Sequence, residues 1–465
     1  MSSYEKYSDK DDILSKTSLK EYIDKNWSEC KKSGSGYKVL CPFHDDKTPS
    51  MQVSDDKGLY HCFVCKAGGN LIQFIKEFKN LTYPETLEEL SIFFNIKIPR
   101  NTYVPVKDKT LNKKMYDFNN KISQFFSRFL LDNERNSKPI KYLQERGFDK
   151  EDIQENSLGF APDSWNTISS TIGEKEELKE IALSLGLISL KDNKKDFYDF
   201  FRNRIIFPIK NRQGNILAFA GRTIGDDKAK YINSKESEIF SKRKILYGLN
   251  NFNKLNGRKP KYIFIVEGYT DVLMMNKRGL YNVVATMGTA LTLDHANEIK
   301  KITNKVILCY DSDKAGIDSS FKNIEPLYQF GIEVFSLRLD NGEDPCSYLQ
   351  TNTIDHFIEK AKKSNLIMEE YMDYLKDKLI EKELSIDEVV DNFVGKIKYV
   401  QNYIQRDEFI NKFASSFSIS KVKVESIINK EFIKNDSSED LVLGYRILSP
   451  EDVIIKVFIE FIDSR

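Results

Sequence analysis

The sequence predicts a multidomain protein of mixed α/β and α+β class, with a small metal-binding module at its N-terminus and a helical region at its C-terminus. The chain has 465 residues, whereas one domain typically holds about 100 to 200. Strand-like and helical patterns alternate from Tyr262 to Tyr310, which indicates a mostly parallel sheet with helices on both faces. From Asn352 onward the sequence is strongly charged and helical in pattern. We therefore expect several domains in series.

The composition is typical of a globular protein that does not enter a membrane. Hydrophobic residues make up 40% of the chain and charged residues 30%. No apolar run approaches the roughly 20 residues that cross a bilayer, and the first residues are too polar for a signal peptide. The 6 cysteines are too few for a disulfide scaffold in a chain of this length. We expect reduced thiols, a cytoplasmic location and no membrane partner.

Two pairs of metal-ligand residues lie close together near the N-terminus. Cys41 and His44 form one pair, and Cys62 and Cys65 form the other after a spacer of 17 residues. Zinc takes four such donors in a tetrahedron, and a site closed by four protein ligands is structural. His61 competes with His44 as a ligand, but a strand would direct it away from its neighbour Cys62, so we favour His44. The sequence predicts one structural Zn²⁺ ion.

Aromatic and basic residues surround these pairs. Phe43, Tyr60 and Phe63 alternate with lysines, a mix that suits the stacking of bases and the neutralising of phosphates. The same aromatic rings can instead form the small core of the module. For Phe63 a core position is at least as well supported, and for Tyr60 and Lys47 the two alternatives are even.

Acidic residues follow three apolar strands of the predicted sheets. Glu267 follows the first strand, Asp311 and Asp313 follow the second, and Asp344 follows the third. The carboxyl ends of parallel strands line one crevice, and convergent carboxylates repel unless cations lie between them. Mg²⁺ prefers such oxygen ligands, and two ions can stabilise the attacking and leaving oxygens of a phosphoryl transfer. A D-x-D pair that merely caps a helix is the simpler alternative, but it does not account for all three strand ends.

A basic segment lies between the metal-ligand pairs and the acidic residues. Residues 200–261 contain 15 Lys and Arg against 4 Asp and Glu, which leaves a net charge of +11. Arg202 and Arg204 are two residues apart, so they share one face of an extended segment and can grip a phosphate. We expect the same function for Arg222 and Lys230. A solvated charge run accounts better for the remaining lysines and arginines near residue 258.

Short motifs occur in a fixed order along most of the chain. They surround the metal-ligand pairs, the basic segment and the acidic residues in turn. They are Cys41-Pro-Phe-His44, Tyr60-His-Cys62-Phe-Val-Cys65, Tyr142-Leu-Gln-Glu-Arg146-Gly147, Leu158-Gly-Phe-Ala-Pro162, Gly221-Arg222, Lys230-Tyr-Ile-Asn-Ser234, Val266-Glu-Gly-Tyr-Thr-Asp271, Met287-Gly-Thr-Ala290, Tyr310-Asp-Ser-Asp313 and Asp340-Asn-Gly-Glu-Asp344-Pro345. In these motifs and in their order the sequence resembles the bacterial DnaG-type replicative primases.

The resemblance implies synthesis of short RNA primers on a single-stranded DNA template from nucleoside triphosphates. It implies that one group of residues binds Mg²⁺, or Mn²⁺ in its place, with Glu267 nearest the reacting hydroxyl, and that a second group forms a basic ridge for template and nucleotides. The implied metal ligands are Glu267, Asp311, Asp313 and Asp344, and the implied ridge is Arg146, Arg202, Arg204, Arg222, Lys230 and Lys242. A replicative helicase and a single-stranded DNA-binding protein are the implied protein partners.

The resemblance also implies a domain order. A zinc ribbon comes first, then a primase core with a Toprim α/β fold at its centre, and then helices. The expected boundaries are a zinc-binding domain at residues 1–99, a linker at 100–114, the N-terminal part of the core at 115–255, the Toprim domain at 256–349, a helical subdomain at 350–433, and at 434–465 a linker with the start of a helicase-binding helical domain.

Two departures from the family pattern matter. The family usually shows Asp-Pro-Asp where this chain has Asp344-Pro345-Cys346, so one outer metal carboxylate is missing. We expect weaker Mg²⁺ binding or better tolerance of a softer ion such as Mn²⁺. An apolar helix is predicted to start at Ser449-Pro450, and we expect it to need a partner surface that the chain does not supply.

Other functions fit parts of these observations. A Toprim nuclease or topoisomerase would use the same acidic residues, although nothing here marks the tyrosine nucleophile of a topoisomerase. A zinc-dependent DNA-binding adaptor would retain the fold without catalysis. A primase fused to a helicase is disfavoured, because the chain has no G-x-x-x-x-G-K-[ST] phosphate loop.

Overall fold

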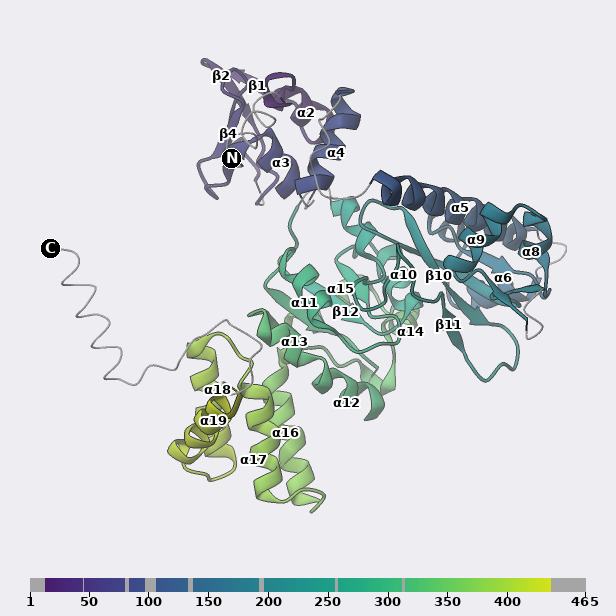
Figure 1. Ribbon diagram of the computed structural model, residues 1–465. Coiled ribbons are helices and arrows are strands. Elements are labelled where there is room, and N and C mark those ends of the chain that lie inside the picture. The colour runs from purple at the N-terminus through teal and green to yellow at the C-terminus, as the bar shows by residue number, and fades with distance from the viewer. Residues whose placement is uncertain are drawn as a thin grey trace. The chain divides into compact units, whose positions relative to one another are not determined.

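The structure is a computed structural model that describes residues 13–44, 46–79, 83–96, 106–132, 137–191, 196–255, 258–311 and 314–435 (Figure 1). The chain separates into two compact units, Met1–Asn365 and Leu366–Arg465. Within the described part of the chain, no helix is both long enough and apolar enough to span a bilayer. The apolar helix predicted from Ser449 and the linker residues after Asn435 lie outside the described residues.

The N-terminal module of the first unit is an antiparallel sheet with helices packed against it. Its five strands follow the chain order, β1-β2-β3-β4-β5. Met51 and Val53 of β3 pack with Phe74 and Ile75 of α3 in one hydrophobic core. The elements are α2 (Leu19–Asn26), β1 (Lys31–Ser33), β2 (Gly36–Val39), β3 (Met51–Ser54), β4 (Leu59–Cys62), β5 (Gly68–Asn70), α3 (Leu71–Phe78) and α4 (Tyr83–Phe94).

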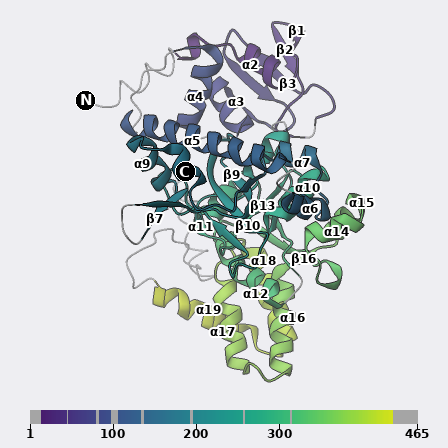
Figure 2. The same ribbon diagram turned by 90° about the vertical axis from the view of Figure 1, so that its right-hand side faces the viewer.

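A second antiparallel sheet, in the order β11-β10-β9-β6, follows in the chain. The long helix α5 lies across it and contacts β6 and β10 (Figure 2). All but the last residue of β9 is buried, as expected for a strand covered on both faces. The elements are α5 (Val106–Leu131), α6 (Ser137–Glu145), α7 (Lys150–Glu155), β6 (Gly159–Ala161), α8 (Thr167–Ile172), α9 (Glu176–Ser184), β7 (Ile188–Leu190), β8 (Phe197–Asp199), β9 (Arg204–Lys210), β10 (Ile216–Thr223), β11 (Tyr231–Asn233) and η1 (Leu249–Leu255).

Helix α5 differs from the sequence-based prediction. It begins at Val106, so residues 106–114, which we assigned to a linker, are helical. The segment contains no proline or glycine after Pro105 and is rich in lysine, which favours helix despite its weak apolar periodicity.

The third part of the first unit contains the predicted parallel sheet. Strands β13, β12, β14 and β15 lie side by side in this order, and each pair is parallel. The helix expected from Thr292 is present, with the Thr292 hydroxyl capping its N-terminus. The elements are β12 (Ile263–Val266), α10 (Tyr269–Lys277), β13 (Val283–Ala285), α11 (Leu293–Lys300), β14 (Lys305–Leu308), α12 (Lys314–Lys322), α13 (Ile324–Gln329), β15 (Glu333–Ser336), η2 (Asp340–Gly342), α14 (Pro345–Thr351) and α15 (Ile354–Lys362).

The second unit is helical, which confirms the predicted helical C-terminal region. Its helices, drawn from green to yellow in Figure 1, pack on one another around buried apolar side chains. The rings of Phe393 and Phe413 stack with their centroids 3.9 Å apart. The helices are α16 (Ile367–Ile380), α17 (Ile386–Ile397), α18 (Tyr403–Ser416) and α19 (Lys421–Asn435), and the short strand β16 (Asn365–Leu366) precedes them.

Candidate zinc centre and active site

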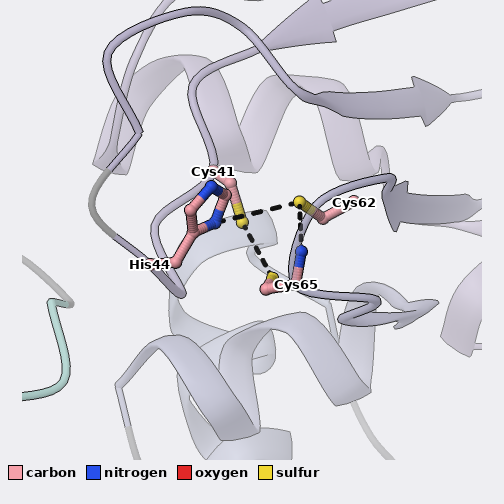
Figure 3. Close-up of side chains that lie close together, drawn as sticks. All are labelled: Cys41, His44, Cys62 and Cys65. Atoms are coloured by element: carbon pink, nitrogen blue, oxygen red, sulfur yellow. Dashed lines mark hydrogen bonds between the residues drawn. The ribbon is translucent and has the colours of Figure 1, made fainter.

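The four predicted zinc ligands converge in the N-terminal module (Figure 3). One ligand atom from each of Cys41, His44, Cys62 and Cys65 lies within 4.8 Å of the others. The sulfur atoms of Cys41 and Cys65 are 3.7 Å apart. Two thiolates bound to one tetrahedral zinc ion at about 2.3 Å are separated by about 3.8 Å, so this spacing fits zinc.

Local hydrogen bonds hold the two ligand loops in place. The carboxylate of Asp46 accepts hydrogen bonds from the backbone N–H of Cys41 at 2.8 Å and from the hydroxyl of Ser50 at 2.6 Å. Burial raises the pKa of Cys62, but hydrogen bonds from Ser50 and from backbone N–H groups outweigh it and bring this pKa to about 7. A lowered thiol pKa favours the thiolate, which is the form that binds metal.

His61, the alternative zinc ligand, and the aromatic side chains near the site differ in how far they are buried. His61 is exposed and packs its ring against Phe63, outside the group of four, so the geometry favours His44. Tyr60 is 3% exposed and belongs to the module's core, whereas Phe63 is 57% exposed. The core alternative therefore holds for Tyr60 and not for Phe63. The phenol of Tyr60 donates a hydrogen bond to Glu77 at 3.2 Å, so this hydroxyl has a hydrogen-bond partner within the module.

In the parallel sheet, strand ends bring Glu267 and Asp311 close together. Glu267 directly follows β12, and Asp311 follows β14, the neighbouring parallel strand. A Cβ added at Gly316 of α12 would lie 2.2 Å from the carbonyl oxygen of Asp311 and 3.1 Å from Oε1 of Glu267. Both residues therefore approach one point at the start of α12. Asp313 lies outside the described residues.

Asp271 connects these strand ends to Asp344. Its buried carboxylate accepts hydrogen bonds from the backbone N–H of Gly268 at 2.9 Å and of Cys346 at 3.1 Å. Burial raises the pKa of Asp271 to about 7, and the charges of Asp344 and Asp311 add to the rise. The carboxylates thus lie close enough to repel one another, as a cation site requires. Asp271 was not among the site residues predicted from the sequence, although its E-G-x-x-D spacing in the first turn of α10 was visible.

Cys346 occupies a buried position beneath this group. Its side chain lies in the hydrophobic core, with the sulfur 3.9 Å from the backbone carbonyl oxygen of Arg146. Burial raises the pKa of Cys346 to about 12, with a further rise from the charges of Asp271 and Asp344. A buried thiol is a poor ligand for Mg²⁺, which prefers the oxygen atoms of carboxylates.

Two predicted ridge residues meet beside Asp344. The guanidinium of Arg222 lies 4.0 Å from the ring centre of Tyr142, and that of Arg146 lies 5.7 Å from the same ring. A nitrogen of Arg146 lies 3.9 Å from a carboxylate oxygen of Asp344. Tyr142 thus orders two cations next to the acidic residues, a role that its place in a sequence motif did not reveal.

Arg202 and Arg204 do not share a face, contrary to the prediction. Asn203 between them has a φ of 49°, so the backbone is not extended there and the alternation fails. Arg204 is 6% exposed, and its guanidinium donates to the carbonyl oxygen of Ala229 at 3.0 Å and pairs with Asp227 at 3.0 Å. Arg202 instead stacks over the exposed ring of Trp165 at 3.8 Å. Lys230 is exposed and Lys242 is half-buried.

Comparison with known proteins identifies the family. The chain matches the model of a CHC2 zinc finger over residues 6–105, of the DNA primase catalytic core, N-terminal domain, over 125–253, and of a Toprim-like domain over 264–349. It is 36% identical to a DNA primase of Staphylococcus aureus over 452 residues, which cover 96% of this chain and 74% of the relative. The chain belongs to the DnaG-type DNA primase family.

Solved primase structures agree with this assignment. The zinc-binding and RNA polymerase domains of the Aquifex aeolicus primase match 90% of this chain and 98% of that chain, with 28% identity and a TM-score of 0.57. A DnaG primase catalytic domain bound to single-stranded DNA matches 68% of this chain and 99% of that chain, with 26% identity and a TM-score of 0.59. The predicted fold class, family and enzymatic activity are confirmed, and the activity is RNA-primer synthesis by nucleotidyl transfer. The comparisons therefore favour the primase over the nuclease and topoisomerase alternatives.

Proposed function

We propose that Glu267, Asp311, Asp313 and Asp344 hold the Mg²⁺ ions of the primase reaction, and that Mn²⁺ can replace Mg²⁺. The observation that carries this proposal is the buried carboxylate of Asp271, which accepts hydrogen bonds from the N–H of Gly268, next to Glu267, and of Cys346, two residues after Asp344. The approach of Glu267 and Asp311 to Gly316 supports the inclusion of Glu267. Carboxylate oxygens are the donors that Mg²⁺ prefers.

The reaction joins two nucleotides. The 3′ hydroxyl of one attacks the α-phosphorus of a nucleoside triphosphate, a new phosphodiester bond forms, and pyrophosphate leaves. Mg²⁺ held by Glu267, Asp311, Asp313 and Asp344 would supply positive charge to stabilise the attacking and leaving oxygens. We assign to Glu267 the place nearest the attacking hydroxyl. Asp271 is a positioning residue, because its two hydrogen bonds hold the loops that carry Glu267 and Asp344.

A priming assay tests these assignments. The chain is incubated with a single-stranded DNA template and labelled nucleoside triphosphates, in Mg²⁺ and in Mn²⁺. The double variant Glu267→Gln, Asp311→Asn is expected to bind the template and to make no primer. Normal primer from this variant would overturn the metal-site proposal, and template binding without primer from the unaltered chain would favour a DNA-binding adaptor.

We further propose that Cys41, His44, Cys62 and Cys65 hold one structural Zn²⁺ ion. The sulfur spacing of 3.7 Å and the closed set of four donors support this role, since no position is left for a reacting water.

For the basic residues we propose two roles. One group contacts the phosphates of the template and of the incoming nucleotides, and the single-stranded DNA bound by a related catalytic domain supports this. Arg204 positions the others, because its guanidinium is buried and bound to Asp227 and backbone carbonyl groups. The phosphate-binding group is Arg146, Arg202, Arg222, Lys230 and Lys242.

The remaining expectations stay proposals. We propose a cytoplasmic location, a replicative helicase as the partner of the segment from Ser449 onward, and a single-stranded DNA-binding protein as a further partner. The apolar character of residues 453–462 supports a protein interaction there. We keep the domain boundaries proposed above, with the linker shortened to end before Val106.

A further inference from the structure

The basic tripeptide Lys242-Arg243-Lys244 lies in an irregular segment between β11 and η1, yet its backbone is firmly held. The N–H of Lys242 donates to the carboxylate of Glu236 at 2.9 Å, and the N–H of Lys244 donates to the carbonyl oxygen of Ser241 at 3.0 Å. Arg243 and Lys244 are exposed, and Lys242 is half-buried. The backbone is thus anchored while cationic side chains remain accessible.

Two side chains from the start of α11 complete the anchoring. The hydroxyl of Thr292 donates to the carbonyl oxygen of Arg243 at 2.6 Å. Nε2 of His295 lies 2.9 Å from the carbonyl oxygen of Lys242. These two residues lie 49 and 53 positions further along the chain than their partners, so they tie the basic segment to the parallel-sheet domain.

The protonation of His295 follows from its partners. A carbonyl oxygen only accepts, so Nε2 must carry the hydrogen, and Nδ1 accepts from the N–H of Thr292 at 3.3 Å and must be bare. Burial lowers the pKa of His295, which keeps the ring neutral. The side chain is 0% exposed, and an apolar residue of the same size would leave the Lys242 carbonyl without this donor.

We propose that Thr292 and His295 are positioning residues that hold Lys242 and Arg243 so that their side chains meet a phosphate of the substrate. The inference rests on the proposed function, which assigns phosphate binding to Lys242, and it adds the residues that make this interaction possible. A cation on a fixed backbone loses less conformational entropy on binding than one on a mobile loop. The phosphate can belong to the template backbone or to the incoming nucleoside triphosphate.

The test uses the full chain and compares matched variants. His295→Phe keeps a ring of similar size and removes the donor, and Thr292→Val removes the hydroxyl. Thr303→Val is the control, because the Thr303 hydroxyl also donates to a backbone carbonyl, that of Lys261 at 3.1 Å, in the same part of the chain but away from the tripeptide. The variant Lys242→Ala, Arg243→Ala shows the effect of losing the cations themselves.

Two readouts separate the sources of phosphate. Affinity for single-stranded DNA is measured against salt concentration, and KM for nucleoside triphosphates and kcat are measured in the priming assay. If the phosphate belongs to the template, His295→Phe and Thr292→Val make DNA binding less dependent on salt. The slope of the logarithm of the binding constant against the logarithm of the salt concentration then falls in magnitude by about 0.7 for each phosphate that the protein no longer neutralises. If the nucleotide is bound, both raise its KM at little cost in kcat. Adding Lys242→Ala and Arg243→Ala to His295→Phe should cause little further change in template affinity or in KM, because these residues act together.

Each outcome decides the inference. Wild-type salt slope and KM in both His295→Phe and Thr292→Val overturn it, whereas the proposed function survives if Lys242→Ala, Arg243→Ala is impaired. If Lys242→Ala, Arg243→Ala behaves like the wild type in both measurements, the inference is overturned, and so is the assignment of phosphate binding to Lys242. The assignment of primer synthesis to the chain does not depend on this result. If His295→Phe fails to fold, Thr292→Val carries the test, and equal defects in Thr292→Val and Thr303→Val also overturn the inference.

Discussion

Replacing Gly316 by alanine tests how tightly the acidic site is built. The new Cβ would lie 2.2 Å from the carbonyl oxygen of Asp311 and 3.1 Å from Oε1 of Glu267, whereas real Cβ atoms essentially never approach other atoms within 3.0 Å. The backbone at Asp311 would therefore move by about 0.8 Å or more, and displacements of about 1 Å at reacting groups cost up to about 100-fold in rate. We expect Gly316→Ala to lower kcat for primer synthesis by about 10- to 100-fold.

Gly395→Ala is the matched control. Gly395 also lies in a helix, α17, and a Cβ there would meet nothing within 4 Å. Alanine should stabilise that helix by up to about 1 kcal/mol and leave priming unchanged. Template affinity, circular dichroism and kcat are measured for both variants. A Gly316→Ala protein that primes at the wild-type rate would refute the close approach of Asp311 and Glu267 to α12.

The other predictions concern the zinc centre, Asp271 and the arginines. Cys62→Ser should lose zinc, measured as metal content, and should unfold the N-terminal module, because four-ligand zinc sites contribute folding energy; retained zinc would contradict the ligand assignment. The pKa of Asp271 is raised from 3.8 to about 7 in the folded protein, so between these two values the folded state binds more protons at this carboxyl than the unfolded state does. Asp271 therefore destabilises the folded protein increasingly as the pH rises from about 4 to 7. Without divalent metal, the melting temperature of Asp271→Asn relative to wild type should therefore rise across this pH range, and a constant difference would contradict the raised pKa. Arg204→Lys should destabilise the chain by about 2 kcal/mol in denaturant unfolding, since lysine cannot keep the bonds to Asp227 and Ala229, whereas Arg202→Lys should leave stability unchanged and weaken template binding.

Features that depend on short spacing were predictable from the sequence. Cys41, His44, Cys62 and Cys65 occur as two close pairs, and strand pairing fixes their distance once the turns form. The parallel sheet was predictable because its strands are apolar runs with helical patterns between them, and topology then places Glu267 and Asp311 at neighbouring strand ends.

Features that depend on one backbone angle or on long-range packing were not predictable in this way. Arg202 and Arg204 point to different surroundings because Asn203 adopts a left-handed conformation, which no alternation pattern contains. Tyr60 lies in the core and Phe63 at the surface, whereas the sequence left Tyr60 undecided and supported a core position at least as well for Phe63, since burial depends on α3 packing over one face of the sheet. The partners of His295 lie 53 residues away, and nothing local marks them.

The N-terminal module has a hydrophobic core of its own, and this makes the chain's unfolding a composite process. Domains with separate cores need not lose their structure together, so one melting temperature does not describe the whole chain. The chain has 2 tryptophans, and they lie in different domains: Trp27 packs against the core of the zinc module, and Trp165 lies exposed on the domain that carries β9 and β10, where Arg202 stacks on its ring. Removing either residue leaves a fluorescence probe for the other part, while the helical second unit, Leu366–Arg465, contributes no tryptophan emission.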